Sequence, residues 1–513
     1  MIIGFANIYP FRPHIKHMVY LINHALKCGH EIYYLECDGV FNNCFLKIDK
    51  NPIIKNFSCI KCKFGGLNTF LEKSPDNFST YLNDNDIKLK DFSYSSISTI
   101  FHKYGLSDIK NLKDPLIKKK TEKTRKTINK AYKGAKNWIK HRKFDLVFGF
   151  NGRIDITNGI LNASLDLKIP YVSVERSWTG NGIQLNYNGT PTSLKGFHDT
   201  IKFFRDKPLN RDQISLAYSF VFKRFNKISL GEFRQYNLKQ KKGLFKEKIK
   251  WLYLPSSIYE RIEHPDFKNN WIDPIKPINF LIKKGFIKPS EIIIRGHPQW
   301  QKYSMSSEIY FTEISKKLGI RYIPSNSKIS TQELIINSEN LIVFGSSSAF
   351  EAGILGKRIL NLSHTFYLNG GFTYNFLKEG DFDIDKFLKM DPRKIIIQTL
   401  RCIYSINNRY MQFLDSLKAK NSYDYDFNEF EDLKYFDKII KNKSIPFNDD
   451  KFEKHNEAEK NFLNKFFINR YKNIYQNDYL HFDNFKKNKL KKIHISRKRE
   501  MFFMDIIDTL TKK

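Results

Sequence analysis

The sequence predicts an α/β protein with two Rossmann-like, doubly wound domains and a helical C-terminal extension. Short apolar runs alternate with amphipathic segments, as in parallel sheets covered by helices, and the alternation occurs in two blocks of comparable size. The chain has 513 residues, 41% of them hydrophobic, which suffices for about three units of roughly 150 residues each. We place these units at residues 1–245, 246–390 and 391–513.

The first block opens with a β-α-β unit. The apolar run at residues 2–6 is followed by a turn-rich stretch, NIYPFRPH, and by apolar residues at helical spacing up to Leu26. Gly29 ends this helix, and residues 31–36 (EIYYLE) form the next predicted strand.

The same pattern recurs later in this block. Residues 145–150 and 171–175 are predicted strands, joined by the turn NGR and an apolar helix. Neither turn contains a Gly-x-Gly-x-x-Gly pattern, so the sequence shows no dinucleotide fingerprint. A strongly basic helix is expected over residues 118–142, where a solvated helical face is the simplest interpretation.

The second block begins near residue 248. Its predicted strands cover residues 251–254, 291–294, 321–323 and 341–344. The sequence Ser257-Ile-Tyr-Glu260 has the spacing of a helix capping box, one helix ends near Gly319, and another begins after Ser330. In such open sheets a ligand lies beyond the carboxyl ends of the strands, where this block carries polar turns.

One of these turns is rich in serine. Ser346, Ser347 and Ser348 follow a strand and begin a short helix, where unpaired N–H groups and the helix dipole favour a phosphate or carboxylate. Ser348 and Glu351 also have capping-box spacing, which gives a purely structural alternative. The two interpretations are compatible, because three serines exceed what a cap requires.

A histidine follows another strand of the same block. His297 comes after residues 291–294 and is preceded by Arg295. An imidazole at this edge can donate to, or protonate, a leaving phosphate. An ordinary turn histidine is the alternative, and the serine turn in the same block favours the catalytic interpretation.

These stretches resemble a known family. In order, LYLPSSIYER, RGHPQW and STQELIINSENLIVFGSSSAFEAGILGKRILNL are similar to the donor-binding half of GT-B glycosyltransferases, especially bacterial capsule polysaccharide biosynthesis proteins of the Kdo-transferase type. The resemblance covers residues 251–369, and the N-terminal half shows looser similarity. It implies a GT-B-like fold whose second domain binds a nucleotide sugar and whose first domain receives the acceptor.

The resemblance also implies roles for residues on the donor side. His297 would contact or protonate the donor phosphate, and Ser346 and Ser347, next to Ser348, would hold the phosphate or a sugar carboxylate. Glu351 would accept hydrogen bonds from the ribose, with its carboxylate turned away from the cap. Arg295 is also a donor-binding candidate, although it stands at a position that varies in the family. A CMP- or CDP-linked donor is favoured, and UDP and dTDP stay open.

An inverting transferase needs a general base on the acceptor side. The candidates are His14, Asp38 and Glu175, which all follow or end predicted strands. Glu175 could instead pair with a neighbouring arginine, and His14 could serve only its own loop. The remaining acceptor-side candidates are Arg12, Asn151, Arg153 and Arg176.

Four cysteines form a separate cluster in the sequence. The six cysteines of the chain are too few for a disulfide scaffold. Four thiolates around one Zn²⁺ would staple the loop after the second strand, and free thiols are the alternative. The chemistry itself requires no cofactor. The cysteines concerned are Cys37, Cys44, Cys59 and Cys62.

The chain is strongly basic, with a formal net charge of +34. This charge favours acidic partners, although a general compositional bias explains it equally well. No apolar run reaches about 18 residues and the first residues do not resemble a signal peptide, so we expect a cytoplasmic protein. Residues 485–499 carry only basic charges and precede an amphipathic stretch at 501–510, which suits peripheral binding to an anionic membrane surface. A docked terminal helix is the alternative.

The sequence therefore predicts a glycosyltransferase of surface polysaccharide assembly. It would transfer a sugar from a nucleotide donor, with a CMP-linked sugar acid favoured, to a polysaccharide or lipid-linked glycan. A sugar-nucleotide epimerase, a CDP-polyol phosphotransferase and a non-catalytic polyanion-binding protein are the alternatives. We expect no nucleic-acid partner, because the sequence has no zinc-finger, RRM or KH signature.

Overall fold

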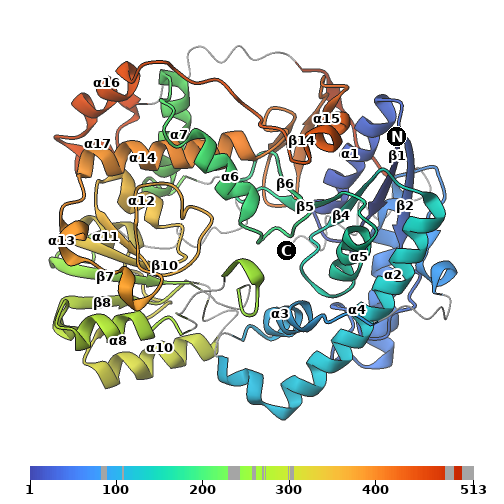
Figure 1. Ribbon diagram of the computed structural model, residues 1–513, viewed down its shortest axis with the longest axis horizontal. Helices are drawn as coiled ribbons and strands as arrows, with labels where there is room; N and C mark the ends of the chain where they lie inside the picture. The colour runs from blue at the N-terminus through green and yellow to red at the C-terminus, as the bar shows by residue number, and fades with distance from the viewer. Residues whose placement is uncertain are drawn as a thin grey trace.

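The computed structural model contains two large sheets and one small sheet. It describes residues 1–82, 89–106, 109–228, 243–256, 261–267, 271, 273–298, 300, 305–479 and 490–498. The first sheet lies on the right in Figure 1 and the second on the left. We refer to the parts built around them as the first half and the second half.

The first sheet has six strands in the order β3-β2-β1-β4-β5-β6. All neighbouring pairs are parallel except β5 and β6, which run antiparallel. The strands are β1 (Ile2–Ala6), β2 (Glu31–Glu36), β3 (Asp76–Asn77), β4 (Leu146–Phe150), β5 (Tyr171–Arg176) and β6 (Ile183–Tyr187). The helices of this half are α1 (His14–Lys27), α2 (Pro52–Gly65), α3 (Ser93–Tyr104), α4 (Pro115–Arg142) and α5 (Asp155–Asp166).

The second sheet is parallel throughout and has the order β12-β11-β10-β7-β8-β9. Counted within each half, both sheets follow the order 3-2-1-4-5-6, which defines a Rossmann-type sheet. The predicted α/β class with two such sheets is therefore confirmed. The strands are β7 (Ile249–Pro255), β8 (Ile292–Arg295), β9 (Arg321–Ile323), β10 (Ser338–Phe344), β11 (Arg358–Asn361) and β12 (Tyr374–Asn375).

Apolar faces of the helices bury both sides of the first sheet. Helices α4 and α5 cover one face, with Trp138 fully buried among their side chains. Helix α1 covers the other face and shares its core with aromatic residues from the C-terminal part of the chain, including Phe427 and Phe436. Since both faces are covered, the central strands β1 and β4 are continuously apolar, as expected for a parallel sheet.

The second sheet is also covered on both faces. One face packs against α6 (Lys195–Phe204), α7 (Arg211–Phe225), α12 (Ala349–Ile354), α14 (Pro392–Tyr404) and α16 (Glu457–Phe466). The other face packs against α8 (Lys276–Lys283) and α10 (Met305–Leu318). Helices α6 and α7 precede residue 245 but share the second half's core. The domain boundary at 245 stays a prediction.

The C-terminal part is not purely helical. It contains an antiparallel sheet, β13-β14-β15, that the sequence analysis did not predict, because its strands are only two to four residues long. Of the basic stretch 485–499, residues 490–498 are described, and the Lys498 N–H donates to the Thr69 carbonyl at 2.9 Å. Residues 501–510 lie outside the described part. The elements are β13 (Leu417–Ala419), β14 (Tyr425–Asn428), α15 (Tyr435–Asn442), α17 (Arg470–Asn473) and β15 (Lys492–Ile493).

The loops at the carboxyl ends of the two sheets contact one another. The rings of Tyr94 and His264 are 4.8 Å apart, and those of Trp178 and Phe366 are 5.2 Å apart. The backbone N–H of Leu194 donates to the Asp266 carboxylate at 2.8 Å. The ligand-binding edges expected for the two sheets therefore face each other.

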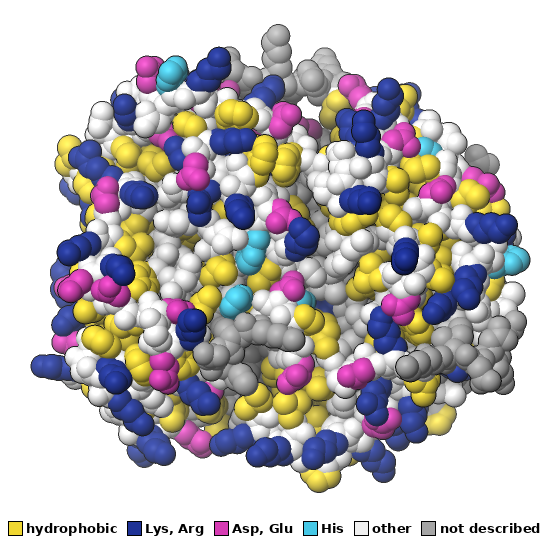
Figure 2. All heavy atoms as spheres, in the orientation of Figure 1, with side chains coloured by type: hydrophobic (Ala, Val, Ile, Leu, Met, Phe, Trp, Pro, Cys, Tyr) yellow, Lys and Arg dark blue, Asp and Glu magenta, His cyan; other side chains and the backbone are white. Residues whose placement is uncertain are grey.

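Lys and Arg side chains are spread over the whole visible face of the molecule rather than gathered in one patch (Figure 2). Histidine side chains are visible near the centre of this face, between the two halves. No helix within the described part of the chain combines the length and the apolar composition needed to cross a membrane.

Candidate active site

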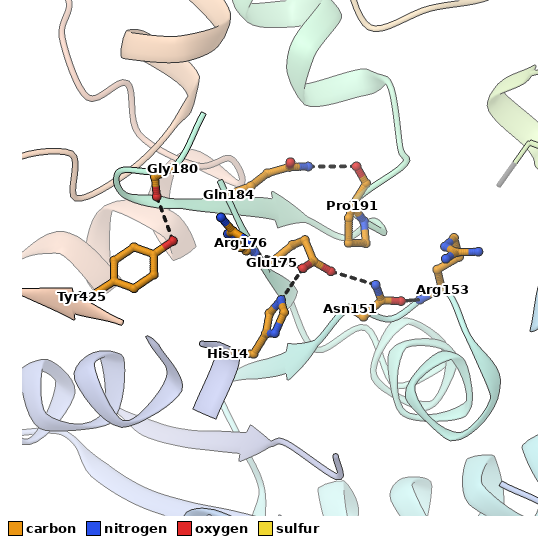
Figure 3. A network of polar contacts seen from close by, with 9 residues as sticks. All are labelled: His14, Asn151, Arg153, Glu175, Arg176, Gly180, Gln184, Pro191 and Tyr425. Atoms are coloured by element: carbon orange, nitrogen blue, oxygen red, sulfur yellow. Dashed lines mark hydrogen bonds and ion pairs between the residues drawn. The ribbon is translucent and has the colours of Figure 1, made fainter. Parts of the chain in front are cut away.

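A histidine and a glutamate meet at the carboxyl edge of the first sheet. Nε2 of His14 and Oε1 of Glu175 lie within hydrogen-bond distance of each other (Figure 3). His14 is the first residue of α1, directly after the turn that follows β1, and Glu175 lies near the end of β5. The contact therefore spans the point where the strand order reverses, between β1 and β4.

Two further groups hold the glutamate carboxylate. The Asn151 side-chain amide donates to Oε2 at 2.9 Å, and the Arg176 N–H donates to Oε1 at 3.0 Å. Figure 3 shows His14 and Asn151 approaching the carboxylate from two sides. Asn151 has a φ of 60°, a left-handed conformation that asparagine tolerates better than most residues. This conformation lets the tight turn after β4 direct the Asn151 side-chain amide towards the Glu175 carboxylate.

These contacts keep Glu175 ionised. Burial alone would raise its pKa, but the charge and hydrogen bond of His14, together with the Asn151 and Arg176 donors, lower the pKa to about 2. The His14 and Glu175 side chains are 13% and 22% exposed, so both are largely screened from water. A carboxylate in this state is a weak proton acceptor and a good partner for an imidazolium.

The second nitrogen of His14, Nδ1, is buried and has no hydrogen-bond partner among the described residues. The ring packs against Phe150, with ring centroids 4.7 Å apart. One turn further along α1, burial lowers the pKa of His17, an effect that His14 and Arg176 reinforce. His17 is therefore a weaker proton acceptor than an ordinary histidine.

The structure does not bring the third base candidate into this group. Asp38 is exposed, and no hydrogen bond or ion pair among the described residues joins it to His14 or Glu175. Arg153 is buried and donates to the Ser98 hydroxyl at 2.6 Å, while Arg12 lies in the half-buried turn before α1. The Arg153 backbone N–H also donates to the Asn151 side-chain oxygen at 3.0 Å. Of the predicted acceptor-side residues, His14, Asn151, Arg153, Glu175 and Arg176 therefore form one connected network (Figure 3).

On the opposite half, the serine turn follows β10 as predicted. The hydroxyl oxygen of Ser346 accepts a hydrogen bond from the Ser348 N–H at 3.2 Å, and the Tyr367 hydroxyl donates to the Ser346 carbonyl at 2.9 Å. All three serines are half-buried. These bonds fix the turn and leave its hydroxyl groups at the carboxyl edge of the second sheet.

The expected capping box is not formed. Ser348 makes no side-chain cap, and the carboxylate of Glu351 instead pairs with Arg224 of α7 at 3.2 Å. The Arg224 guanidinium also lies 3.3 Å from the Ser347 hydroxyl. Sequence analysis missed Arg224, because it precedes Glu351 by 127 residues and belongs to no motif. The Glu351 carboxylate does turn away from the cap, but towards an arginine.

A second arginine that was not predicted, Arg261, contacts the backbone of the serine turn. Arg261 donates to the carbonyls of Phe344 and Gly345 at 3.2 and 3.0 Å. Gly345 has a φ of +76°, and a Cβ there would lie only 1.9 Å from the Arg261 guanidinium. Glycine is thus required both for the backbone and for the approach of this cation. The predicted Ser257–Glu260 capping box lies outside the described residues.

The histidine and arginine after β8 have different surroundings. His297 is half-buried, and its carbonyl accepts from the Trp300 N–H at 2.9 Å. Arg295 is 2% exposed and donates to the carbonyls of Pro324 and Ser327 in the loop after β9. Burial lowers the pKa of Arg295 to about 10. This guanidinium holds a loop, which differs from the donor contact expected of it.

The four predicted cysteine ligands line one small cavity beside Tyr9. Cys59 and Cys62 lie on helix α2 rather than in a metal-binding turn. Burial raises the pKa of Cys37 to about 11 and that of Cys44 to about 12, which favours thiols. Within the described ranges, no three His, Cys, Asp or Glu side chains are arranged to hold a metal ion. Structural zinc stays a prediction, and purified protein with no more than trace zinc or iron would contradict it.

A buried carboxyl group next to this cavity was not predicted. Asp155 is fully buried, accepts a hydrogen bond from the Tyr9 hydroxyl and another from the Phe45 N–H at 2.6 Å. Burial raises its pKa to about 6, partly offset by these donors. The only sequence signal is its place four residues after Asn151, at the start of α5.

Comparison with solved structures gives distant similarities. The β-Kdo 2,4 transferase KpsC of Thermosulfurimonas dismutans shares 13% identity over 51% of this chain and 79% of its own, with a TM-score of 0.31. The β-Kdo 2,7 transferase KpsC of the same organism shares 13% identity over 58% and 84%, with a TM-score of 0.33. The UDP-GlcNAc 2-epimerase of Neisseria meningitidis shares 11% identity over 80% and 97%, with a TM-score of 0.27.

The similarities include the Kdo transferases of the kind that the sequence motifs resemble. At these TM-scores they carry no inference about what this chain binds or catalyses. No protein-family model and no curated protein matches the sequence. The function is therefore argued from the site itself.

Proposed function

We propose that the protein is a glycosyltransferase that transfers a sugar from a nucleotide-activated donor to a polysaccharide or lipid-linked glycan. The observation that carries this proposal is the His14–Glu175 pair at the carboxyl edge of the first sheet, on the side that faces the second half. A histidine oriented by an ionised carboxylate is a suitable general base. The serine turn at the matching edge of the second sheet would hold the donor.

In this proposal His14 accepts the proton of the acceptor hydroxyl on Nδ1, the nitrogen without a protein hydrogen bond. The acceptor oxygen forms a bond to the anomeric carbon of the sugar while the bond from that carbon to the donor phosphate oxygen breaks. Glu175, whose pKa is about 2, stays ionised and stabilises the imidazolium that forms. Glu175 is thus a positioning residue, and His14 is the base.

The leaving phosphate would be held on the second half. The hydroxyl groups of Ser346 and Ser347 can donate to it, and Arg224, 3.3 Å from the Ser347 hydroxyl, adds positive charge. His297 would donate to or protonate the leaving oxygen. A CMP-linked sugar acid is the favoured donor, from the resemblance of the motifs to Kdo transferases.

Nucleotide binding tests the donor site. We expect one of CMP, CDP, UDP, GDP or dTDP to stabilise the purified protein against heat, because a ligand at about 100 times its Kd adds about 2.7 kcal/mol. His297→Ala should reduce this stabilisation, and His455→Ala, at an exposed residue, should not. No response to any of the five nucleotides would contradict the proposal.

Incubation with the donor alone separates transfer from epimerisation. An epimerase inverts one sugar carbon without an acceptor, whereas a transferase changes the donor only when an acceptor is present or by slow hydrolysis. Proton NMR of the donor after incubation distinguishes these outcomes. Appearance of an epimeric nucleotide sugar would replace the transferase proposal by the epimerase alternative.

A lipid-linked acceptor would place the protein at an anionic membrane surface. The basic charges of residues 485–499 support this part of the proposal. Flotation with anionic liposomes, compared between the full chain and a variant lacking residues 485–513, is the test. Equal flotation of both proteins would show that residues 485–513 do not bind the membrane.

A further inference from the structure

A second polar hollow lies at the opposite edge of the second sheet. It has a volume of about 570 Å³ and lies where β7, β10 and β11 begin, whereas the serine turn lies where β10 ends. Helix α17, which closes it, is at the outer edge of the second half (Figure 1). Its polar lining includes Lys248, Ser338, Lys357, Arg358, Arg470 and Tyr471.

The hollow contains four cationic side chains and one carboxylate, that of Glu339. None of these cations forms an ion pair with a described carboxylate, in contrast to Arg224. Lys357 is 8% exposed, and its ammonium donates to the carbonyls of Ile336, at 3.0 Å, and Ser338. Carbonyl oxygens orient this charge without neutralising it.

Arg470 is held in the same way. Nε of Arg470 donates to the Leu355 carbonyl at 2.7 Å, and its guanidinium lies over the ring of Tyr471, 4.8 Å from the ring centroid. Burial would raise the pKa of Tyr471, but the charges of Lys357 and Arg470 lower it. The positive potential of the hollow is therefore strong enough to act on a neighbouring phenol.

Arg358 contributes a guanidinium to the lining of the hollow. Its Nε is buried and makes no hydrogen bond with the described residues, and no described carboxylate pairs with the guanidinium. The hollow thus has positive charge that no described ion pair compensates.

We propose that this hollow binds a phosphate-bearing small molecule, separately from the serine turn. Its volume lies within the 300–1,000 Å³ or so typical of small-molecule sites. A phosphate ester carries a charge of about −1.5 to −2, which suits four cations better than the single charge of a carboxylate does. The Tyr471 side chain, 37% exposed, would lie beside the bound molecule.

The test is calorimetric titration with pyrophosphate at 150 mM salt. The Ser346→Ala/Ser347→Ala variant removes the hydroxyl groups of the serine turn and so weakens pyrophosphate binding there. Binding to the hollow is then measured as the part of the affinity that depends on Lys248 and Arg358. Adding Lys248→Gln and Arg358→Gln should weaken binding at least about tenfold, the loss expected for charge-assisted hydrogen bonds. Lys250→Gln is the matched control, because Lys250 lies two residues after Lys248, on β7, but pairs with Glu291 outside the hollow.

A second measurement needs no variant, so it does not depend on whether a variant folds. Acetylation of Lys248, which is exposed, is followed by mass spectrometry in the unmodified protein with and without pyrophosphate. We expect protection of Lys248 and none of Lys250. Equal acetylation of Lys248 in both samples, or equal affinity of the charge-removal variant, would overturn the site. Glucuronate binding as tightly as pyrophosphate would overturn the assignment to phosphate.

Discussion

The two halves share one strand order but present different chemistry at their carboxyl edges. In the first half, an imidazole, a carboxylate and an amide bond to one another. In the second half, serine hydroxyl groups and two arginines surround the end of β10. The first set can exchange a proton, whereas the second can hold an anion. Topology therefore determines where each site lies, and the residues of the turns determine what each site can do.

The largest effect is expected from replacing His14, the proposed general base in the first half. His14→Gln should lower kcat for sugar transfer by about 10²–10⁴, because general base catalysis is lost. Stabilisation by the nucleotide should be unchanged, since the donor lies on the other half. Steady-state kinetics and thermal unfolding measure the two quantities. Loss of nucleotide binding in this variant would contradict the proposal that the first half supplies the base and the second half binds the donor.

The Arg224–Glu351 ion pair of the second half is buried more deeply than the His14–Glu175 contact of the first half, and this contrast is also testable. The Arg224 and Glu351 side chains are 9% and 1% exposed. Arg224→Met should lower the free energy of unfolding in urea by about 3–5 kcal/mol, because the buried Glu351 carboxylate loses the positive charge of Arg224. The double variant Arg224→Met/Glu351→Met should recover most of this loss. A single variant as stable as the parent would mean that Glu351 is not ionised.

The pH dependence of stability tests whether the pKa of Glu175 is lowered in the folded protein. Its pKa is lowered from 4.5 to about 2 in the folded protein, so its ionised form contributes stability above pH 4.5 that is lost as the pH falls towards 2. Glu175→Gln should therefore be less stable than the parent by about 2–3 kcal/mol at pH 7. The difference should shrink between pH 4.5 and 2. Urea unfolding at several pH values measures it, and a constant difference would contradict the assignment.

The smallest effect concerns the serine turn. Gly345→Ala should cost about 2 kcal/mol, from a left-handed backbone and from contact with Arg261. Gly319→Ala is the matched control, because Gly319 also has a positive φ, +69°, but nothing lies within 4 Å of an added Cβ. It should cost about 1 kcal/mol. Equal losses in the two variants, measured by urea unfolding, would show that Arg261 does not approach the turn closely.

Much of the fold follows from local sequence patterns. The strands around residues 2–6, 31–36 and 341–344 are apolar runs bounded by turns, and their lengths make them recognisable. The strands β13 to β15 are too short for such a pattern. Their pairing joins residues near 418, 426 and 492, and no local signal specifies contacts at that separation.

The candidate site could be predicted only in part. Parallel topology places the carboxyl ends of strands together, so His14 and Glu175 could both be named from their positions. Which way a side chain points at a strand end was not predictable. Arg295 was expected to face the donor, but it is buried against the loop after β9. Arg224 comes from a helix outside any motif and could be found only from the structure.

The C-terminal part of the chain has a mechanical consequence. The C-terminal part alternates between the two halves. Helix α14 and, later, Phe462 pack on the second half, whereas Phe427 and Phe436 pack on the first half. Arg497 then lies beside Thr69 of the first half. The two halves are thus joined by several spans of backbone rather than by one tether. Any opening or closing of the two halves must therefore move these spans together. The C-terminal part thus couples the proton-accepting edge of one half mechanically to the anion-holding edge of the other.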